Sequence, residues 1–172
     1  MSRCLIVANQ TLGGEALDRA VRDCISRDVS LFYIVVPRIR VKDELEAYTG
    51  GFGVHVGVPP DQIEAIHEQA ARHHQAAVAE AQRRARQRLD QMIEKIQSAG
   101  GQADGEVGAD DPLEATKAVL ERHGDFDEII VSTLPAGASR WVKMDVPHRI
   151  ARLTDVPVTT VQAKRQRAKS LA

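Results

Sequence analysis

Short apolar runs that alternate with amphipathic segments constrain the fold of this chain most strongly. The runs Cys4–Ala8 and Leu31–Val36 are typical of strands buried on both faces of a sheet. Between them, apolar residues recur with the spacing of one helical face: Ala16, Leu17, Ala20, Val21, Cys24 and Ile25. A strand, a helix and a second strand in this order predict a parallel crossover unit.

The same alternation returns in the second half of the chain. We expect strands at residues 103–109, 127–133 and 157–162, and a helix at residues 112–123. A final helix carries its apolar residues on one face: Val146, Ile150 and Leu153. Five strands with intervening helices predict an α/β fold, a three-layer sandwich in which an open sheet has helices on both faces.

The middle of the chain differs from this pattern. Residues 38–60 contain four glycines and predict a mobile inserted excursion. Pro60 then opens a helical pattern that lasts to Gly100, and we expect this long second helix to break near residues 72–75, because an unbroken helix of about 40 residues is roughly 60 Å long. We interpret residues 1–163 as one domain and residues 164–172 as a basic tail.

Composition excludes several classes of protein. No apolar run reaches the roughly 18 residues that span a membrane, and the N-terminal run is too short for a signal peptide, so we expect a cytoplasmic protein. A net charge of −1 and 3% aromatic residues argue against a nucleic-acid partner, since such a protein needs a basic surface or aromatic side chains on which bases stack. Cys4 and Cys24 lie at apolar positions and are expected to be reduced core residues.

In the order and spacing of its motifs the chain resembles the universal stress protein family. The matching segments are the opening strand with its polar turn, the long second helix, Val107-Gly108-Ala109-Asp110-Asp111-Pro112, Phe126-Asp127-Glu128-Ile129-Ile130-Val131-Ser132, and Val156-Pro157-Val158-Thr159-Thr160-Val161. The resemblance covers nearly the whole chain. It implies an open parallel sheet of order 3-2-1-4-5, a homodimer and, in one branch of the family, an ATP site.

The chain departs from the glycine motif of the ATP-binding branch, G-x-x-G, nine residues, then G-[ST]. Aligned from its start, the motif falls on Ser132, Pro135, Asp145 and Val146. Such glycines let backbone N–H groups close on a phosphate, and side chains or a proline obstruct that approach. Asn9 also stands where family members carry an aspartate. We therefore expect a divergent branch that binds ATP weakly or not at all and needs no cofactor.

The carboxyl ends of the strands are the predicted ligand-binding edge of an open α/β sheet. Arg140, His148 and Arg149 could converge there on an anion, or else form a solvated surface. The candidate ligand-binding residues are Asn9, Thr11, Val36, Ser132, Thr133, Ser139, Arg140, His148 and Arg149. The arginine-rich run 83–88 is interpreted as the solvent side of the long helix.

Other chemistry is weakly supported by the sequence. His67, His73 and His74 lack the usual spacing of metal ligands on a helix, so no metal site is expected. Ser132 or Ser139 could be combined with His148 and Asp145, but no nucleophile-elbow motif marks a catalytic serine. We expect no catalytic residues.

These observations favour a universal-stress-protein-like regulatory or ligand-binding module whose small-molecule or protein partner is unknown. The alternatives are a stress protein that binds a nucleotide or small anion through the altered loop and, less favoured, a hydrolase or transferase. The last strand is β-branched and would be a sheet edge, which predicts a homodimer through Val158, Thr159, Thr160 and Val161.

Overall fold

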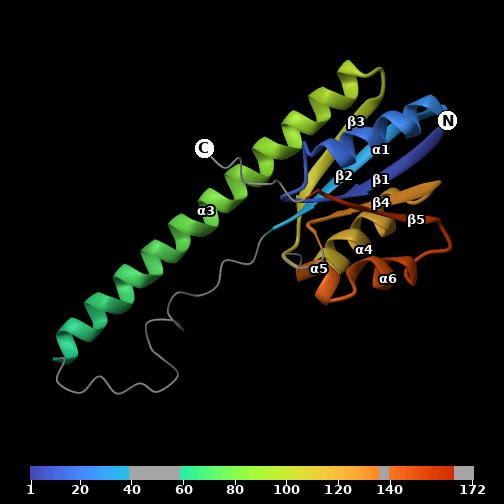
Figure 1. The fold of residues 1–172 in the computed structure, drawn as a ribbon. Helices are drawn as coiled ribbons and strands as arrows, with labels where there is room; N and C mark the ends of the chain where they lie inside the picture. The colour runs from blue at the N-terminus through green and yellow to red at the C-terminus, as the bar shows by residue number, and fades with distance from the viewer. Residues whose placement is uncertain (39–58, 136–139, 165–172) are drawn as a thin grey trace, which may run out of the picture. The chain divides into compact units, whose positions relative to one another are not determined.

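The computed structural model describes residues 1–38, 59–135 and 140–164 (Figure 1). Most of the predicted excursion at 38–60 and of the basic tail at 164–172 lies outside these ranges. The chain divides into two compact units, one formed by residues 1–38 and 85–172 and the other by residues 39–84.

The first unit contains the five-stranded sheet. Its strands are β1 (Ser2–Val7), β2 (Val29–Pro37), β3 (Gln102–Gly108), β4 (Glu128–Thr133) and β5 (Val158–Gln162). All neighbouring strands are parallel, and their order is β3-β2-β1-β4-β5. The predicted strand order is therefore confirmed.

Helices cover both faces of this sheet (Figure 1). One face packs against α1 (Glu15–Ser26) and the second half of α3 (Pro60–Ser98). The other face packs against α4 (Pro112–His123) and α6 (Val146–Ala151), while α5 (Arg140–Lys143) contributes Trp141. The predicted three-layer α/β sandwich is confirmed.

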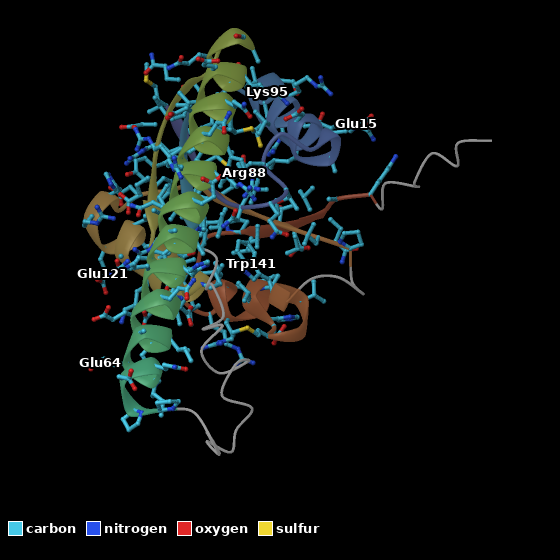
Figure 2. The ribbon with its side chains drawn as sticks, turned by 90° about the vertical axis from the view of Figure 1, so that its left-hand side faces the viewer. Glu15, Glu64, Arg88, Lys95, Glu121 and Trp141 are labelled. Atoms are coloured by element: carbon cyan, nitrogen blue, oxygen red, sulfur yellow. The ribbon has the colours of Figure 1, made fainter. Side chains whose placement is uncertain are left out.

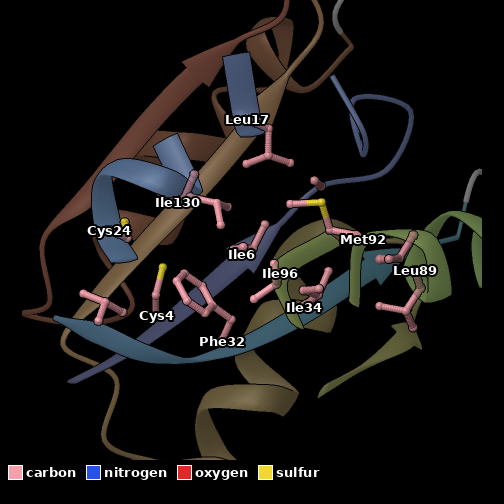
Figure 3. Packing of buried hydrophobic residues seen from close by; sticks show 14 of the residues in the cluster. Cys4, Ile6, Leu17, Cys24, Phe32, Ile34, Leu89, Met92, Ile96 and Ile130 are labelled. Atoms are coloured by element: carbon pink, nitrogen blue, oxygen red, sulfur yellow. The ribbon is translucent and has the colours of Figure 1, made fainter. Parts of the chain in front are cut away.

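The strand β1 belongs to both cores, because successive side chains of a strand point to opposite faces. Cys4 and Ile6 pack under α1 and α3, whereas Leu5 and Val7 pack under α4 and α6. All four are completely buried. Figure 3 shows the first of these cores, in which Leu89 and other residues of α3 meet the sheet.

The helix α3 is unbroken over 39 residues, so the expected break near residues 72–75 is wrong. This stretch contains neither proline nor glycine, and Arg72 pairs with Glu68 one turn earlier at 3.8 Å. The buried residues of α3 all lie in its second half: Ala85, Leu89, Met92 and Ile96. None of the described helices is long and apolar enough to cross a membrane.

A pair of substitutions in α3 tests which part of the helix belongs to the core. Leu89→Ala removes a fully buried side chain and should lower the free energy of unfolding by about 2–5 kcal/mol. Ile66→Ala acts at a side chain that is 43% exposed and should change it by less than about 0.5 kcal/mol. Urea unfolding followed by the fluorescence of Trp141, the single tryptophan, measures both. Equal losses would show that the first half of α3 is part of the same cooperative core.

Candidate functional site

Polar residues follow β1 and β4 at the carboxyl edge of the sheet. Val7 lies level with Val35 in β2 and with Val131 in β4. Continuing this register by two residues places Asn9 level with Pro37 on one side and with Thr133 on the other. Because neighbouring strands lie about 4.8 Å apart, these three residues form one row across the edge.

Asn9 is held between a backbone carbonyl and an arginine. Its side-chain Nδ2 donates to the carbonyl oxygen of Pro37, and its Oδ1 accepts from Nη1 of Arg88 at 3.0 Å. Asn9 is only 6% exposed. Arg88 is a half-buried side chain of α3 (Figure 2). Within the described part of the chain no carboxylate forms an ion pair with Arg88, so its charge meets a neutral amide.

The turn after β1 is fixed by its own hydrogen bonds. The N–H of Leu12 donates to the Asn9 carbonyl, and the N–H of Gly14 donates to the Thr11 carbonyl at 3.0 Å. Gly13 has a φ of 80°, which favours glycine. The hydroxyl of Thr11 donates to the carbonyl oxygen of Ser132 at 3.2 Å and so ties this turn to the end of β4.

Thr133 has a buried hydroxyl without a hydrogen-bond partner. The residue is 1% exposed, and its Oγ1 is among the few buried side-chain polar atoms of the described residues that lack a partner. Such a group costs about 1–3 kcal/mol relative to a bonded one. At a strand-end edge, an unpartnered hydroxyl indicates a position where a ligand could supply the missing bond.

The remaining predicted residues lie elsewhere or outside the described part. Val36 is completely buried in the core under α1 and α3. Arg149 is exposed on α6, and the side chain of His148 is 79% exposed and contacts Asp145 at 3.1 Å. Ser139 and the side chain of Arg140 fall outside the described residues.

Asp145 is the residue before α6, which has Pro147 in its first turn. Its backbone is left-handed, with a φ of 54°, and its side chain makes no capping hydrogen bond to the helix. The carboxylate contacts His148 instead.

Arg88 is the site residue that sequence reasoning missed. The arginine-rich run at 83–88 was expected to face solvent, but Arg88 lies three residues after the buried Ala85 and one before the buried Leu89. This position borders the apolar stripe of the helix. The position of Arg88 beside the apolar residues of the helix therefore indicates that its side chain is partly buried. Nothing in the sequence indicates that Asn9 is its hydrogen-bond partner.

A second cluster lies toward the amino end of the same strands. The Cys4 and Cys24 sulfur atoms and a Glu128 carboxylate oxygen lie within 4.8 Å of one another, and Nη2 of Arg27 contacts Cys24 at 3.3 Å. The pKa of Cys4 is raised by its hydrogen bond to Cys24 and by burial. The same hydrogen bond lowers the pKa of Cys24. Both cysteines are buried and neither forms a disulfide, as expected.

A shallow, open depression of the described surface lies on the exposed side of α3. It is lined by Gln91, Glu94, Lys95, Ser98 and Ala99. None of the candidate ligand-binding residues that the structure describes lines this depression.

Comparisons with known proteins identify the fold. No family model and no curated protein matches the sequence. The solved universal stress protein from Archaeoglobus fulgidus is 10% identical, with a TM-score of 0.51 over 94% of this chain and 93% of that one. The hypothetical protein MJ0577, the subject of a structure-based assignment of biochemical function, is 12% identical, with a TM-score of 0.57 over 96% of this chain and 98% of that one.

A universal stress protein family protein from Arabidopsis thaliana, solved with AMP bound, is 12% identical. Its TM-score is 0.51 over 99% of this chain and 97% of that one. At these identities the comparisons establish the fold alone. The chain therefore has the same fold as these universal stress proteins.

Two buried threonines provide a test of the unpartnered hydroxyl. Thr133→Val replaces it with a methyl group of similar size and should raise the free energy of unfolding by about 1 kcal/mol. Thr116→Val is the matched control, because the equally buried Thr116 hydroxyl donates to the Pro112 carbonyl at 2.7 Å. Losing that bond should cost about 1 kcal/mol. Urea unfolding without ligand measures both, and destabilisation by Thr133→Val would show that its hydroxyl is satisfied.

Proposed function

We propose that this protein is a regulatory ligand-binding module that takes a small phosphorylated ligand at the carboxyl edge of its sheet and binds ATP weakly. The observation that carries the proposal is the buried, unpartnered hydroxyl of Thr133. Extending the register of β1 and β4 places Thr133 level with Asn9, whose side-chain oxygen accepts from Arg88 of α3. The strand-end edge is also where open α/β sheets bind their ligands.

The charge of Arg88 favours an anionic ligand. A guanidinium group offers several donors in one plane and binds phosphate oxygens in pairs. Only Nη1 of Arg88 is engaged by Asn9, and that partner carries no charge. The AMP of the Arabidopsis neighbour makes a nucleoside monophosphate the first ligand to test.

Weak ATP binding is supported by the segment after β4. Pro135 offers no backbone N–H to a phosphate. The side chain of Asp145 is 63% exposed beside the first turn of α6, where a carboxylate repels an incoming polyphosphate. We therefore infer that a triphosphate is disfavoured more strongly than a monophosphate.

A hydrolase or transferase remains the less favoured alternative. Ser132 is 2% exposed, whereas the side chain of His148 is 79% exposed and contacts Asp145. A nucleophile and its base must come within hydrogen-bonding distance of each other. The contrast between a buried serine and an exposed histidine therefore disfavours this pair as a catalytic arrangement.

Calorimetry at physiological salt tests the ligand and its site. We expect AMP to bind the unmodified chain at least about tenfold more tightly than ATP, a difference of roughly 1.4 kcal/mol. Arg88→Met should weaken AMP binding about 10- to 100-fold, since a hydrogen bond to a charged group contributes about 1.5–3 kcal/mol. Arg84→Met is the control, because Arg84 pairs with Glu80 on the same helix.

Three results would contradict this proposal in different ways. Micromolar ATP affinity would refute weak ATP binding. Unchanged AMP affinity in Arg88→Met would place the ligand elsewhere. If neither AMP nor inorganic phosphate binds, phosphorylated molecules are excluded as the ligand class of this site.

We further propose a homodimer through the free edge of β5. The strand pairs with β4 on one side and ends the sheet on the other. The Pro157 carbonyl accepts from Ile129, and the Ala163 N–H donates to Thr133, so odd-numbered residues of β5 direct their backbone toward β4. The N–H of Thr160 therefore points to the free edge, where a second copy related by a two-fold axis could pair with it.

Two proline substitutions distinguish this interface from the internal ladder. Thr160→Pro removes a donor from the free edge and should weaken self-association while leaving the fold intact. Thr159→Pro removes a donor that faces β4 and should destabilise the sheet, because a hydrogen bond of the internal ladder is lost. Sedimentation and circular dichroism measure the two effects. A monomeric unmodified chain at tens of micromolar, or a stable dimer unaffected by Thr160→Pro, would exclude this interface.

A further inference from the structure

Three side chains that can bind metals converge on one point between the sheet and α1. Cys4 of β1 lies level with Glu128 of β4 in the parallel register. Both side chains point to the face covered by α1, because Ile6 and Ile130, two residues further along each strand, pack in the core on that face. Cys24 of α1 completes the cluster, and Figure 3 shows its side chain beside that of Cys4. The two sulfur atoms and a Glu128 carboxylate oxygen lie within 4.8 Å of one another.

A positive group already occupies this cluster. One guanidinium nitrogen of Arg27, Nη2, contacts the Cys24 sulfur at 3.3 Å and the Glu128 oxygens at 3.2 and 3.3 Å. Cys4 and Cys24 are at most 1% exposed, and the side chain of Glu128 is 14% exposed. The side chain of Arg27 is 60% exposed at the end of α1, so it can leave the cluster without disturbing the core.

We propose that Cys4, Cys24 and Glu128 form a Zn²⁺ site in which the ion replaces the guanidinium of Arg27. Zinc binds thiolates at about 2.3 Å and carboxylates at about 2.0–2.2 Å in tetrahedral geometry, which requires ligand atoms roughly 3.6–3.8 Å apart. Small side-chain rotations bring atoms that already lie within 4.8 Å to this separation. The two thiols release their protons to solvent as the ion binds, and water takes the fourth position on the side vacated by Arg27.

The ligand set selects the kind of ion. Two sulfur ligands disfavour Mg²⁺ and Ca²⁺, which bind oxygen atoms. A mixed thiolate and carboxylate set suits the borderline-soft Zn²⁺ better than Cu(I), which prefers sulfur alone. This site lies toward the opposite end of β1 from Asn9, so it is independent of the proposed phosphate site.

Titration of the full-length, metal-free chain tests the proposal. The protein is kept reduced with a phosphine, Zn²⁺ binding is measured by calorimetry, and Co²⁺ is used as a spectroscopic substitute. We expect one equivalent of Zn²⁺ to bind and Co²⁺ to give the absorption of cobalt–thiolate bonds. Glu128→Gln should weaken Zn²⁺ binding at least about tenfold, whereas Arg27→Met should strengthen it by removing the competing cation.

Control variants separate this site from other metal-binding groups. Glu121→Gln removes an exposed carboxylate of α4, and His73→Ala removes a histidine of α3; both should leave Zn²⁺ affinity unchanged. Cys24→Ala should abolish the cobalt–thiolate absorption, and circular dichroism reports whether this variant folds. Because Glu128→Gln and Arg27→Met change only partly exposed side chains, they test the site even if Cys24→Ala does not fold.

Three results would overturn the proposal. Failure of the unmodified chain to bind Zn²⁺ would exclude the site. Cobalt binding without thiolate absorption would exclude the cysteines as ligands. Unchanged Zn²⁺ affinity in both Glu128→Gln and Arg27→Met would place the ion elsewhere.

Discussion

The structure depends on the complete burial of Cys4, Leu5, Ile6 and Val7 in β1, from both faces of the sheet. Its side chains alternate between two cores, so helices are required on both sides of the sheet. Apolar burial contributes roughly 25 cal/mol per Å², and the central strand of a sandwich loses contact with water on each face. Polar side chains can therefore be placed only toward the ends of this strand. Asn9 and Thr11 lie beyond one end, and Cys4 lies near the other, where Arg27 and Glu128 approach from its neighbours.

The polar residues at the carboxyl edge are positioned by backbone groups. Asn9 binds the Pro37 carbonyl and Thr11 binds the Ser132 carbonyl, and both carbonyls belong to strands of the sheet. A side chain held in this way loses little further conformational freedom when a ligand binds. The donors of Asn9 and Thr11 are thus engaged by backbone carbonyls, and the buried Thr133 hydroxyl has no hydrogen-bond partner.

The sequence was sufficient for the fold because each element carries a local signal. Unbroken apolar runs predict β1 and β2, and the helix predicted at residues 112–123 is α4. The Asp111 carboxylate caps the start of α4 by accepting from the N–H groups of Leu113 and Glu114. The continuity of α3 contradicts an expectation based on helix length, because no helix-breaking residue lies between Pro60 and Gly100. The two clusters were missed for another reason: Arg88 and Asn9, like Cys4 and Glu128, are distant in sequence and meet only through strand order and register.

The two arginines beside β1 differ in what they neutralise. Arg27 contacts a carboxylate and a sulfur atom, so a stronger cation can compete for the same ligands. The acceptor of Arg88 is an uncharged amide, so an anion can add to the guanidinium without displacing an opposite charge. Coulomb attraction between unit charges at about 4 Å is about 4 kcal/mol at an effective dielectric constant of 20. The nature of the partner, rather than the arginine itself, therefore decides which charge each end of the strand can attract.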